Sequence, residues 1–552
     1  MPGAEVSPSL KSEERKSEAP ASAPEVNVFA VYGVEPEVQA YAMAKYSRSA
    51  LSMKESLKEI NEQKAEKFLN TFYFQYGHRS IADLAHLALA IERLSILAAI
   101  AIVDEPRWDG QERSTRYQDF KKSGYYLPDF GGDEESRRLY LETIEFLFAE
   151  YQRFSEGMFR YLEERTPRPV EMKPEAYERT LRARAFDLSR YFLPLATHTS
   201  LGEIVNARTL ENQIAHLLSH THAEVRHLAE LLKKAAREPA YNVNQEAWRA
   251  LVEEVRALDP ALGERAAQAL LKEVRAAPTL VKYAEANPYE IETRRELRQA
   301  AAELMDGAEI AVVNPVDLLE DDPLEVELAT TLLYAHCHYP YKQIRREVEG
   351  LDEARRAEII ELGAKHRGKR DELLRPFAAG QKFRFDILMD IGGFRDMHRH
   401  RRCVQILQGF TAAHGYEMPE EVSGAGMRER YDEGMRRAAE AASRLTQRLL
   451  ASGSALVSDE EKGYCLRAER APAWTASPAQ YLLPLAYRCR TLFKMDFAEV
   501  LYIAELRTTP AGHFSYRNVA YDMYRDVARK YPALAKYFRV TDVREPVDLL
   551  KR

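Results

Sequence analysis

Two charged motifs contain the residues of this chain that are best suited to chemistry. Residues 396–405, DMHRHRRCVQ, place three arginines and two histidines in five consecutive positions, although the chain as a whole has a net charge of −7. Forked guanidinium groups bind phosphate through paired hydrogen bonds. Residues 111–120, QERSTRYQDF, add two carboxylates, three hydroxyls and two more arginines. The two motifs predict a site for a phosphorylated ligand, and a solvated, salt-bridged surface is the alternative interpretation of such arginine-rich runs.

The order of residues in the second motif resembles a family signature. Glu112, Ser114, Arg116 and Tyr117 spell E-x-S-x-R-Y, which resembles the second part of the flavin-dependent thymidylate synthase signature, R-H-R, five residues, then E-x-S-x-R-Y. Other segments resemble motifs of that family and follow its order over roughly residues 27–235. They are YGHRSIADLAHLALAIERLS (76–95), GYYLP (124–128), SRYFLPLATHTSLGEIVNARTLEN (189–212) and HAEVRHLAELL (222–232).

An internal repeat suggests that the chain contains this domain twice. YFLPLATHT begins at Tyr191, and YLLPLAYRC begins 290 residues later at Tyr481. Each half is also predicted to open with a strand, a turn containing proline and an acidic helix. We therefore expect a tail at residues 1–26, a first copy at 27–280 and a strongly diverged second copy at 281–552.

The two copies have lost complementary parts of the family pattern. Where the family has R-H-R, the first copy has Asp104-Glu105-Pro106 and the second has Arg399-His400-Arg401. The second copy in turn has Leu407, Gly409 and Thr411 at the E-x-S-x-R-Y positions. A further family arginine is Leu217 in the first copy and Arg507 in the second, whereas Arg190 of the first copy corresponds to Gln480. One complete set of motifs is thus divided between the copies.

The resemblance implies an activity and a site. Family enzymes are homotetramers with sites between subunits, so a fused chain is expected to form a homodimer that imitates a tetramer. The implied reaction is reductive methylation of dUMP to dTMP, with FAD as cofactor and NADPH and methylenetetrahydrofolate as co-substrates. The resemblance implies that dUMP is held by Ser114, Arg116, Arg190, Arg399 and Arg507, of which Ser114, Arg116 and Arg507 would act on the reacting substrate. It assigns FAD to Ser80, Glu112, Asn206, Arg208, Asn212, Arg399, His400 and Arg401.

The resemblance implies an α+β fold, with two tandem diverged copies of the flavin-dependent thymidylate synthase fold, helix-rich with a small sheet in each. The hydrophobic pattern itself indicates many helices and a few short strands. Long helices are expected at 134–165, 207–235, 245–275, 350–375, 428–452 and 496–508, and short strands at 27–34, 125–130 and 309–317. The apolar stretch 84–103 contains His86, Glu92 and Arg93, so a buried helix is predicted there and no membrane segment. Four scattered cysteines and no signal peptide favour a reducing cytoplasm.

Other functions remain as alternatives. His336, Cys337 and His338 are too close in sequence to form a zinc site without further ligands, so no metal is expected. A serine nucleophile is disfavoured because no base stands beside Ser114 in the sequence. A general nucleic-acid surface is not expected of an acidic chain. A diverged flavin- and nucleotide-binding relative stays open, because Asp396 stands where the family usually has Gln, as does a non-catalytic protein that binds nucleotides or RNA.

Overall fold

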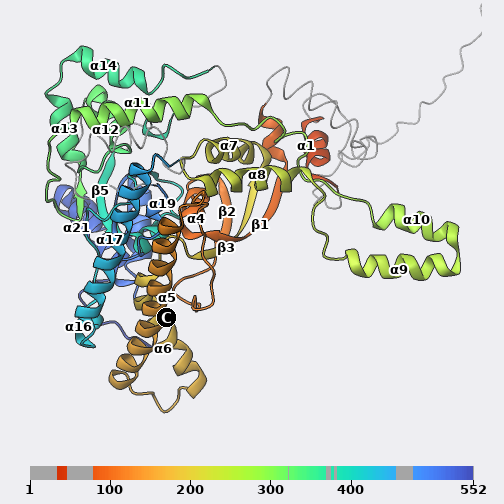
Figure 1. Ribbon diagram of the computed structural model, residues 1–552, viewed down its shortest axis with the longest axis horizontal. Helices are drawn as coiled ribbons and strands as arrows, with labels where there is room; N and C mark the ends of the chain where they lie inside the picture. The colour runs from red at the N-terminus through yellow and green to blue at the C-terminus, as the bar shows by residue number, and fades with distance from the viewer. Residues whose placement is uncertain are drawn as a thin grey trace, which may run out of the picture.

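The computed structural model describes residues 34–45, 79–320, 323–368, 374–377, 382–454 and 477–550. Helices dominate these residues, and the strands form two small antiparallel sheets (Figure 1). This confirms the predicted helix-rich α+β fold. The α-helices are α1 (Pro36–Lys45), α4 (Ile96–Val103), α5 (Glu134–Arg165), α6 (Pro174–Ser189), α7 (Ala207–Leu218), α8 (Ala223–Arg237), α9 (Gln245–Leu258), α10 (Pro260–Leu270), α11 (Pro288–Leu304), α12 (Leu324–Tyr334), α13 (Tyr341–Glu349), α14 (Glu353–Leu362), α15 (Ile391–Met397), α16 (Glu420–Gly424), α17 (Arg428–Ala451), α19 (Ser477–Gln480), α20 (Phe497–Arg507), α21 (Phe514–Lys530) and α22 (Pro532–Ala535).

The strands repeat one arrangement in the two halves of the chain. The first sheet has the order β1-β3-β2 and the second has the order β4-β5-β7-β6. In each sheet a central strand, β3 or β7, pairs with an earlier strand that leads into a helix and with a short edge strand, β2 or β6. The strands are β1 (His86–Ser95), β2 (Trp108–Glu112), β3 (His198–Asn206), β4 (Val316–Leu318), β5 (Phe383–Asp390), β6 (Val404–Leu407) and β7 (Arg488–Met495), and the 3-10 helices are η2 (Arg79–Leu84), η3 (Arg190–Phe192) and η4 (Arg375–Phe377).

The two copies join at the repeat that the sequence revealed. Leu195 donates its N–H to the carbonyl of Leu483 at 3.0 Å, and Leu485 donates to the carbonyl of Leu193 at 3.0 Å. Such reciprocal bonds form when two equivalent segments run antiparallel about a local two-fold axis. Pro194 and Pro484 face each other at its centre. The halves therefore pack against each other as two subunits of a dimer would.

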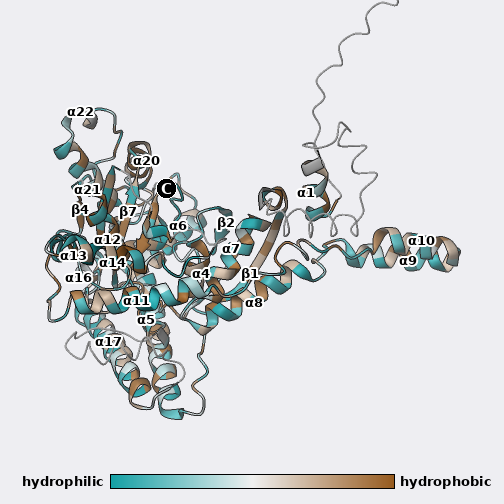
Figure 2. Ribbon diagram, turned by 90° about the horizontal axis from the view of Figure 1, so that it is seen from above, coloured by the Kyte–Doolittle hydropathy of each residue, from teal (hydrophilic) through white to brown (hydrophobic). Residues whose placement is uncertain are grey.

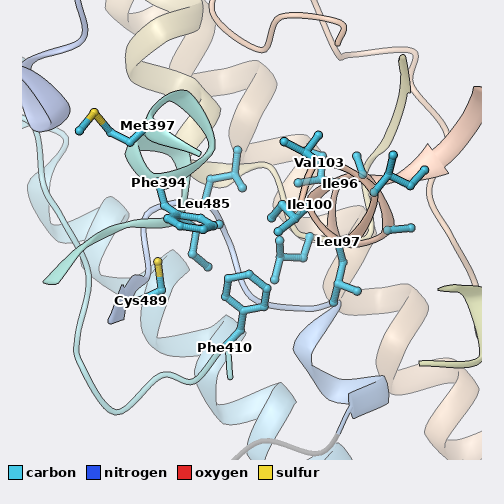
Figure 3. Close-up of a cluster of buried hydrophobic side chains, with 14 of the residues drawn as sticks. Ile96, Leu97, Ile100, Val103, Phe394, Met397, Phe410, Leu485 and Cys489 are labelled. Atoms are coloured by element: carbon cyan, nitrogen blue, oxygen red, sulfur yellow. The ribbon is translucent and has the colours of Figure 1, made fainter. Parts of the chain in front are cut away.

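One hydrophobic core extends through both copies. Ile96 and Ile100 of α4 lie in it together with Phe394 of α15 and with Leu485. Figure 3 shows these side chains, from segments far apart in the sequence, gathered in one cluster. A smaller core lies under helices α11 to α14 of the second copy. In Figure 2 the α9–α10 hairpin projects from this body, with hydrophilic and hydrophobic residues interspersed along it.

The segment 84–103 corrects a sequence prediction, because its first half is a strand. Residues 86–95 form β1, and only Ile96–Val103 are helical. His86 and Glu92 point to solvent while Leu87 and Ile91 are buried, so the segment has the two-residue period of a strand. The many apolar residues of the stretch concealed this alternation. No helix among the described residues is long and apolar enough to cross a bilayer.

The other predicted elements agree to different degrees. Helix α5 occupies the predicted span 134–165, where the Asp133 side chain accepts the N–H of Ser136 at the start and Pro167 follows the end. Predicted helices 428–452 and 496–508 correspond to α17 and α20. The segments 207–235 and 245–275 are each divided into two helices, the latter at Asp259-Pro260, and 350–375 contains the shorter α14.

The predicted strands were short and only partly observed. Of the segment 309–317, only Val316 and Asp317 lie in β4, and Tyr125 of the segment 125–130 forms a single bridge with Thr197. The strand expected at 27–34 lies outside the described residues except for Val34, which is a bend.

Candidate active site

The R-H-R segment of the second copy lies against strand β2 of the first copy within the same chain. Arg399 Nη1 donates to Gln111 Oε1 at 3.1 Å, and Arg401 Nη1 donates to Asp109 Oδ1 at 2.7 Å. Strand β2 is an edge strand, and helix α15 ends at Met397, immediately before these arginines. The local fold of each copy thus brings the complementary motifs together. We call this contact, in which residues 395–401 of the second copy pack against β2 of the first, the arginine junction.

Glu112 is held inside the arginine junction. Its carboxylate accepts a hydrogen bond from Arg395, which also belongs to the second copy, and one from Thr199 Oγ1 at 3.3 Å. Arg399 Nη2 lies 4.0 Å from the same carboxylate. The family motif residue is therefore oriented by arginines from the other copy, and Arg395 is a contact that the sequence comparison did not identify.

Arg116 is fixed by a buried carboxylate. Its Nε and Nη2 donate to the two oxygens of Asp187 at 2.8 and 3.1 Å, and its Nη1 donates to the hydroxyl of Tyr516 at 2.9 Å. Burial raises the pKa of Asp187, but the nearby His513, Arg116 and Arg190 lower it overall, so this carboxylate is ionised. The first-copy arginine is thereby positioned against helix α21 of the second copy.

Arg507 reaches the same place from the second copy. Its Cζ lies 5.5 Å from the centre of the Tyr516 ring, as does the Cζ of Arg116. Its Nε donates to His400 Nε2 at 2.8 Å, and His400 Nδ1 lies 3.3 Å from Glu499 Oε1. Two arginines predicted to bind one ligand thus meet around one tyrosine.

The imidazole of His400 is neutral when it positions Arg507. Burial lowers its pKa, and so does Arg507, although the hydrogen bond to Glu499 acts in the opposite direction. Because Nε2 accepts from Arg507, the proton belongs on Nδ1, from which it is donated to Glu499. Both ring nitrogens are engaged in this structure, so the predicted contact of His400 with flavin stays a prediction.

Arg190 lies at the centre of the contact between the copies. It is 1% exposed, and its Nη1 donates to Asp396 Oδ2 of the second copy at 3.0 Å. Its Nε is 3.7 Å from Asp187 Oδ1. Ser114 lies at the start of the turn that leads to Arg116, and its hydroxyl accepts the Arg116 N–H at 3.2 Å. Ser114, Arg116 and Arg190 of the predicted substrate site are therefore linked through Asp187 and this turn.

The remaining predicted flavin residues form a separate group. Asn206 ends β3 opposite His86 and caps α7, where its Oδ1 accepts the Thr209 N–H at 2.9 Å. Arg208 Nη1 pairs with Asp83 Oδ2 at 3.1 Å, and Asn212 lies further along α7. Glu112 pairs with Leu201, near the middle of β3, whereas Asn206 is the last residue of that strand. Ser80 lies in η2, but its side chain is outside the described residues.

Sequence reasoning missed Asp187 and Tyr516, which contact Arg116, and Glu499, which contacts His400. Only Asp187 had a local signal, because it precedes Arg190 by three residues on a helix. Tyr516 and Glu499 come from segments where the second copy matches the family poorly. Their roles depend on contacts between distant segments. The described residues contain no group of three His, Cys, Asp or Glu side chains arranged to hold a metal ion.

A second junction between the copies mirrors the first but lacks its arginine motif. Here Asp104, which replaces the first residue of R-H-R, lies near strand β6 of the second copy. Arg375 joins them, since its Nη1 donates to Asp104 Oδ1 at 2.6 Å and to the carbonyl of Gln405 at 3.1 Å. Glu105 is adjacent, and burial raises its pKa. We call this contact, residues 104–105 with β6, the acidic junction.

Comparisons with known proteins agree with the duplicated motifs. The family model for "Thymidylate synthase complementing protein" matches twice, at residues 31–240 and 321–533. A UPF0159 protein of Chlamydia muridarum is 27% identical over 94% of this chain and 92% of its own length. A UPF0159 protein of Thermoplasma acidophilum is 24% identical over 88% of this chain and 90% of its own length.

Two further matches cover a smaller part of this chain. A flavin-dependent thymidylate synthase of Clostridium tetani is 26% identical over 38% of this chain and 82% of its own length. A crystal structure of the UMP/dUMP methylase PolB from Streptomyces cacaoi is similar at 18% identity and a TM-score of 0.27, over 36% of this chain and 84% of that chain. The two family matches together cover more than half of the chain. The chain therefore belongs to the thymidylate synthase complementing protein family, of which it carries two tandem, diverged copies.

Proposed function

We propose that this chain is a FAD-dependent thymidylate synthase, which converts dUMP to dTMP with methylenetetrahydrofolate as carbon donor and NADPH as reductant. The observation that carries this proposal is the arginine junction. Arg399 and Arg401 of the second copy contact strand β2 of the first copy, which ends at Glu112. One chain therefore brings both parts of the family motif together. The name of the relative from Clostridium tetani points to the same substrate class.

The residues present fit a dinucleotide cofactor. Arg399 and Arg401 are partly exposed, and Arg401 pairs with the highly exposed Asp109, in a kind of surface ion pair that contributes about 0–1 kcal/mol. A diphosphate could displace that carboxylate at little cost and gain bidentate hydrogen bonds. Asn206 at the end of β3 and Arg208 at the start of α7 would bind another part of the cofactor. When bound there, FAD would carry reducing equivalents from NADPH to the substrate.

The substrate would bind between the copies near Tyr516. Arg116 and Arg507 approach this ring from different copies, and Arg190 is buried beside Asp187. Asp187 and His400 hold two of these guanidiniums in fixed orientations, so their orientation costs little when the substrate binds. In this proposal Ser114 orients the substrate and does not attack it, because its hydroxyl contacts the Arg116 N–H and no base among the described residues that could take its proton.

A product assay tests the proposal. Purified protein is incubated with tritiated dUMP, methylenetetrahydrofolate, FAD and NADPH, and release of tritium from the pyrimidine ring is measured together with dTMP. Omitting FAD or NADPH should abolish turnover. The matched pair of variants is Arg507→Ala, expected to lose turnover, and Arg402→Ala, an exposed arginine outside the R-H-R triplet, expected to retain it.

A diverged activity on another nucleotide is the second candidate, and the Arg190–Asp396 pair favours it because a carboxylate already contacts an arginine expected to hold dUMP. The same assay with other pyrimidine nucleotides separates the two functions. Methylation of another nucleotide and none of dUMP would replace the first proposal. A flavoprotein that binds nucleotides without turning any of them over would refute both.

A further inference from the structure

One of the arginines expected to hold dUMP, Arg190, already contacts a carboxylate. Arg190 Nη1 donates to Asp396 Oδ2 at 3.0 Å. Its Nε lies 3.7 Å from Asp187 Oδ1, and neither Nε nor Nη2 makes a hydrogen bond among the described residues. Unpartnered donors on a buried guanidinium are costly, and they are usually found where a ligand or water completes the site. Arg190 is therefore an anion site that is filled only in part, and a residue of this chain fills that part.

Arg190 is fixed, whereas Asp396 can be reached from solvent. A Cβ on Gly392 would lie 3.3 Å from the Arg190 guanidinium carbon, so the backbone of the second copy closes tightly on this side chain. The side chain of Asp396, near the end of α15, is 26% exposed. An anion that enters the site would therefore meet Asp396 before it reaches Arg190.

Asp396 competes with an incoming anion for its arginine more strongly than Asp109 does. Asp109, which pairs with Arg401, is 87% exposed, and water screens that pair. Burial raises the pKa of Asp396, but Arg190 and Arg116 lower it overall, so the group is charged at neutral pH. The low-dielectric surroundings strengthen its attraction to Arg190. They also strengthen its repulsion of a second anion.

We propose that Asp396 is a specificity-determining residue, whose carboxylate takes the place on Arg190 that a substrate phosphate requires. This rests on the proposed function, in which the substrate is a nucleoside monophosphate. A phosphate with nearly two negative charges must displace Asp396 or share Arg190 with it. The phosphate group then contributes little to the affinity, and the site accepts an unphosphorylated nucleoside almost as well as its monophosphate.

Calorimetric titrations of the FAD-loaded protein with dUMP, deoxyuridine and inorganic phosphate test this. In the wild-type protein the dissociation constants of dUMP and deoxyuridine should differ by about tenfold or less, the lower limit for one hydrogen bond to a charged group. Asp396→Asn and Asp396→Gln should bind dUMP at least about tenfold more tightly and gain affinity for inorganic phosphate. Deoxyuridine affinity should change by less than about twofold, because no phosphate is involved.

Asp496→Asn is the matched control. It makes the same change in net charge at a carboxylate that also pairs with an arginine, Arg402, and Asn remains a good helix cap at this position. It should leave all three affinities unchanged. If both Asp396 variants keep the wild-type melting temperature and flavin absorbance but gain no phosphate affinity, the proposal is overturned. If neither variant folds, the wild-type affinities for dUMP and deoxyuridine decide. The proposal is overturned if the wild-type protein binds dUMP more than about tenfold more tightly than deoxyuridine.

The titrations also distinguish this inference from the proposed function. Inorganic phosphate that binds Asp396→Asn, without any binding of dUMP, supports the role of Asp396 and refutes the nucleotide function. Turnover of dUMP by the wild-type protein, without a gain in either variant, supports the function and refutes the role of Asp396.

Discussion

The arginine junction and the acidic junction occupy equivalent places in the two copies, but they differ in charge. In the first, Arg399 and Arg401 of the second copy lie on β2 of the first. In the second, Asp104 lies near β6, and Arg375 joins it to the backbone of Gln405. Both junctions connect the copies. Only the first presents guanidinium groups at positions that match the family motif.

This difference shows that the contact between the copies does not require the R-H-R motif, which the proposed ligand site needs only once in the chain. Two identical subunits would need every motif twice, since each residue serves its own site. After fusion, one junction suffices for a complete set, and the other must only hold the copies together. At the acidic junction an internal ion pair between Arg375 and Asp104 meets that requirement. Loss of R-H-R there therefore does not open the contact between the copies.

The largest expected effect removes the arginine junction. In Arg399→Ala/Arg401→Ala, two hydrogen-bonding cations are lost at about 1.5–3 kcal/mol each, so the dissociation constant of FAD should rise by about 100-fold or more. Titration with FAD, followed by flavin fluorescence and absorbance, measures this. The matched change at the other junction, Asp104→Ala, should leave FAD binding unchanged. Equal losses in both variants would show that the two junctions do not differ in function.

A smaller effect is expected from single arginines around Tyr516. Arg507→Ala should weaken dUMP binding by about 1.5–3 kcal/mol, the value of a hydrogen bond to a charged group. Arg116→Ala should weaken it as well, but it also leaves the buried Asp187 without its bidentate partner and is expected to destabilise the fold. Arg402→Ala is the control, because Arg402 is exposed and pairs with Asp496. Quenching of protein fluorescence by dUMP gives the affinities. Equal dUMP affinities for all three variants would show that the nucleotide does not bind at Arg507 and Arg116.

The sequence predicted the local features of this site better than its long-range contacts. The repeat at Tyr191 and Tyr481 identified the segments that pair at the centre of the molecule, because identical residues serve both partners of a two-fold contact. The division of R-H-R and E-x-S-x-R-Y between the copies predicted the arginine junction. Asp187 and Tyr516 could not be predicted in this way, because each acts on an arginine distant in sequence or in the other copy. The strand at 86–95 was missed because the prediction followed the high apolar content of the whole stretch 84–103. The alternation of buried and exposed residues within 86–95 was overlooked.

A pH-dependent effect is expected beside the acidic junction, at Glu203. This side chain is 1% exposed, its Oε1 accepts from Gln213 Nε2 at 2.9 Å, and its Oε2 has no partner among the described residues. Burial, with a contribution from Glu105, raises its pKa to about 7 from an ordinary value of 4.5. The folded protein therefore disfavours the ionised form. This destabilisation is absent well below pH 4.5 and develops as the pH rises towards about 7.

Glu203→Gln should remove that pH dependence. At about 1.4 kcal/mol for each pKa unit, discounted for relaxation, the variant should be more stable than wild type by on the order of 2 kcal/mol at pH 8. Below pH 4.5 the difference should vanish. Urea unfolding at both pH values measures it, with the exposed Glu230→Gln as control. A variant that is less stable than wild type at pH 8 would show that Glu203 is stabilised in its charged form.

The smallest difference expected is a factor of two in bound flavin. We predict a homodimer that binds one FAD per chain, because only the arginine junction presents the R-H-R guanidiniums. At the acidic junction Asp104 and Glu105 would repel a diphosphate, and Arg375 is already paired with Asp104. Flavin absorbance against protein concentration, with the mass from light scattering, gives the ratio. Two flavins per chain would mean that the acidic junction also binds the cofactor, and that the division of motifs between the copies has no consequence for binding.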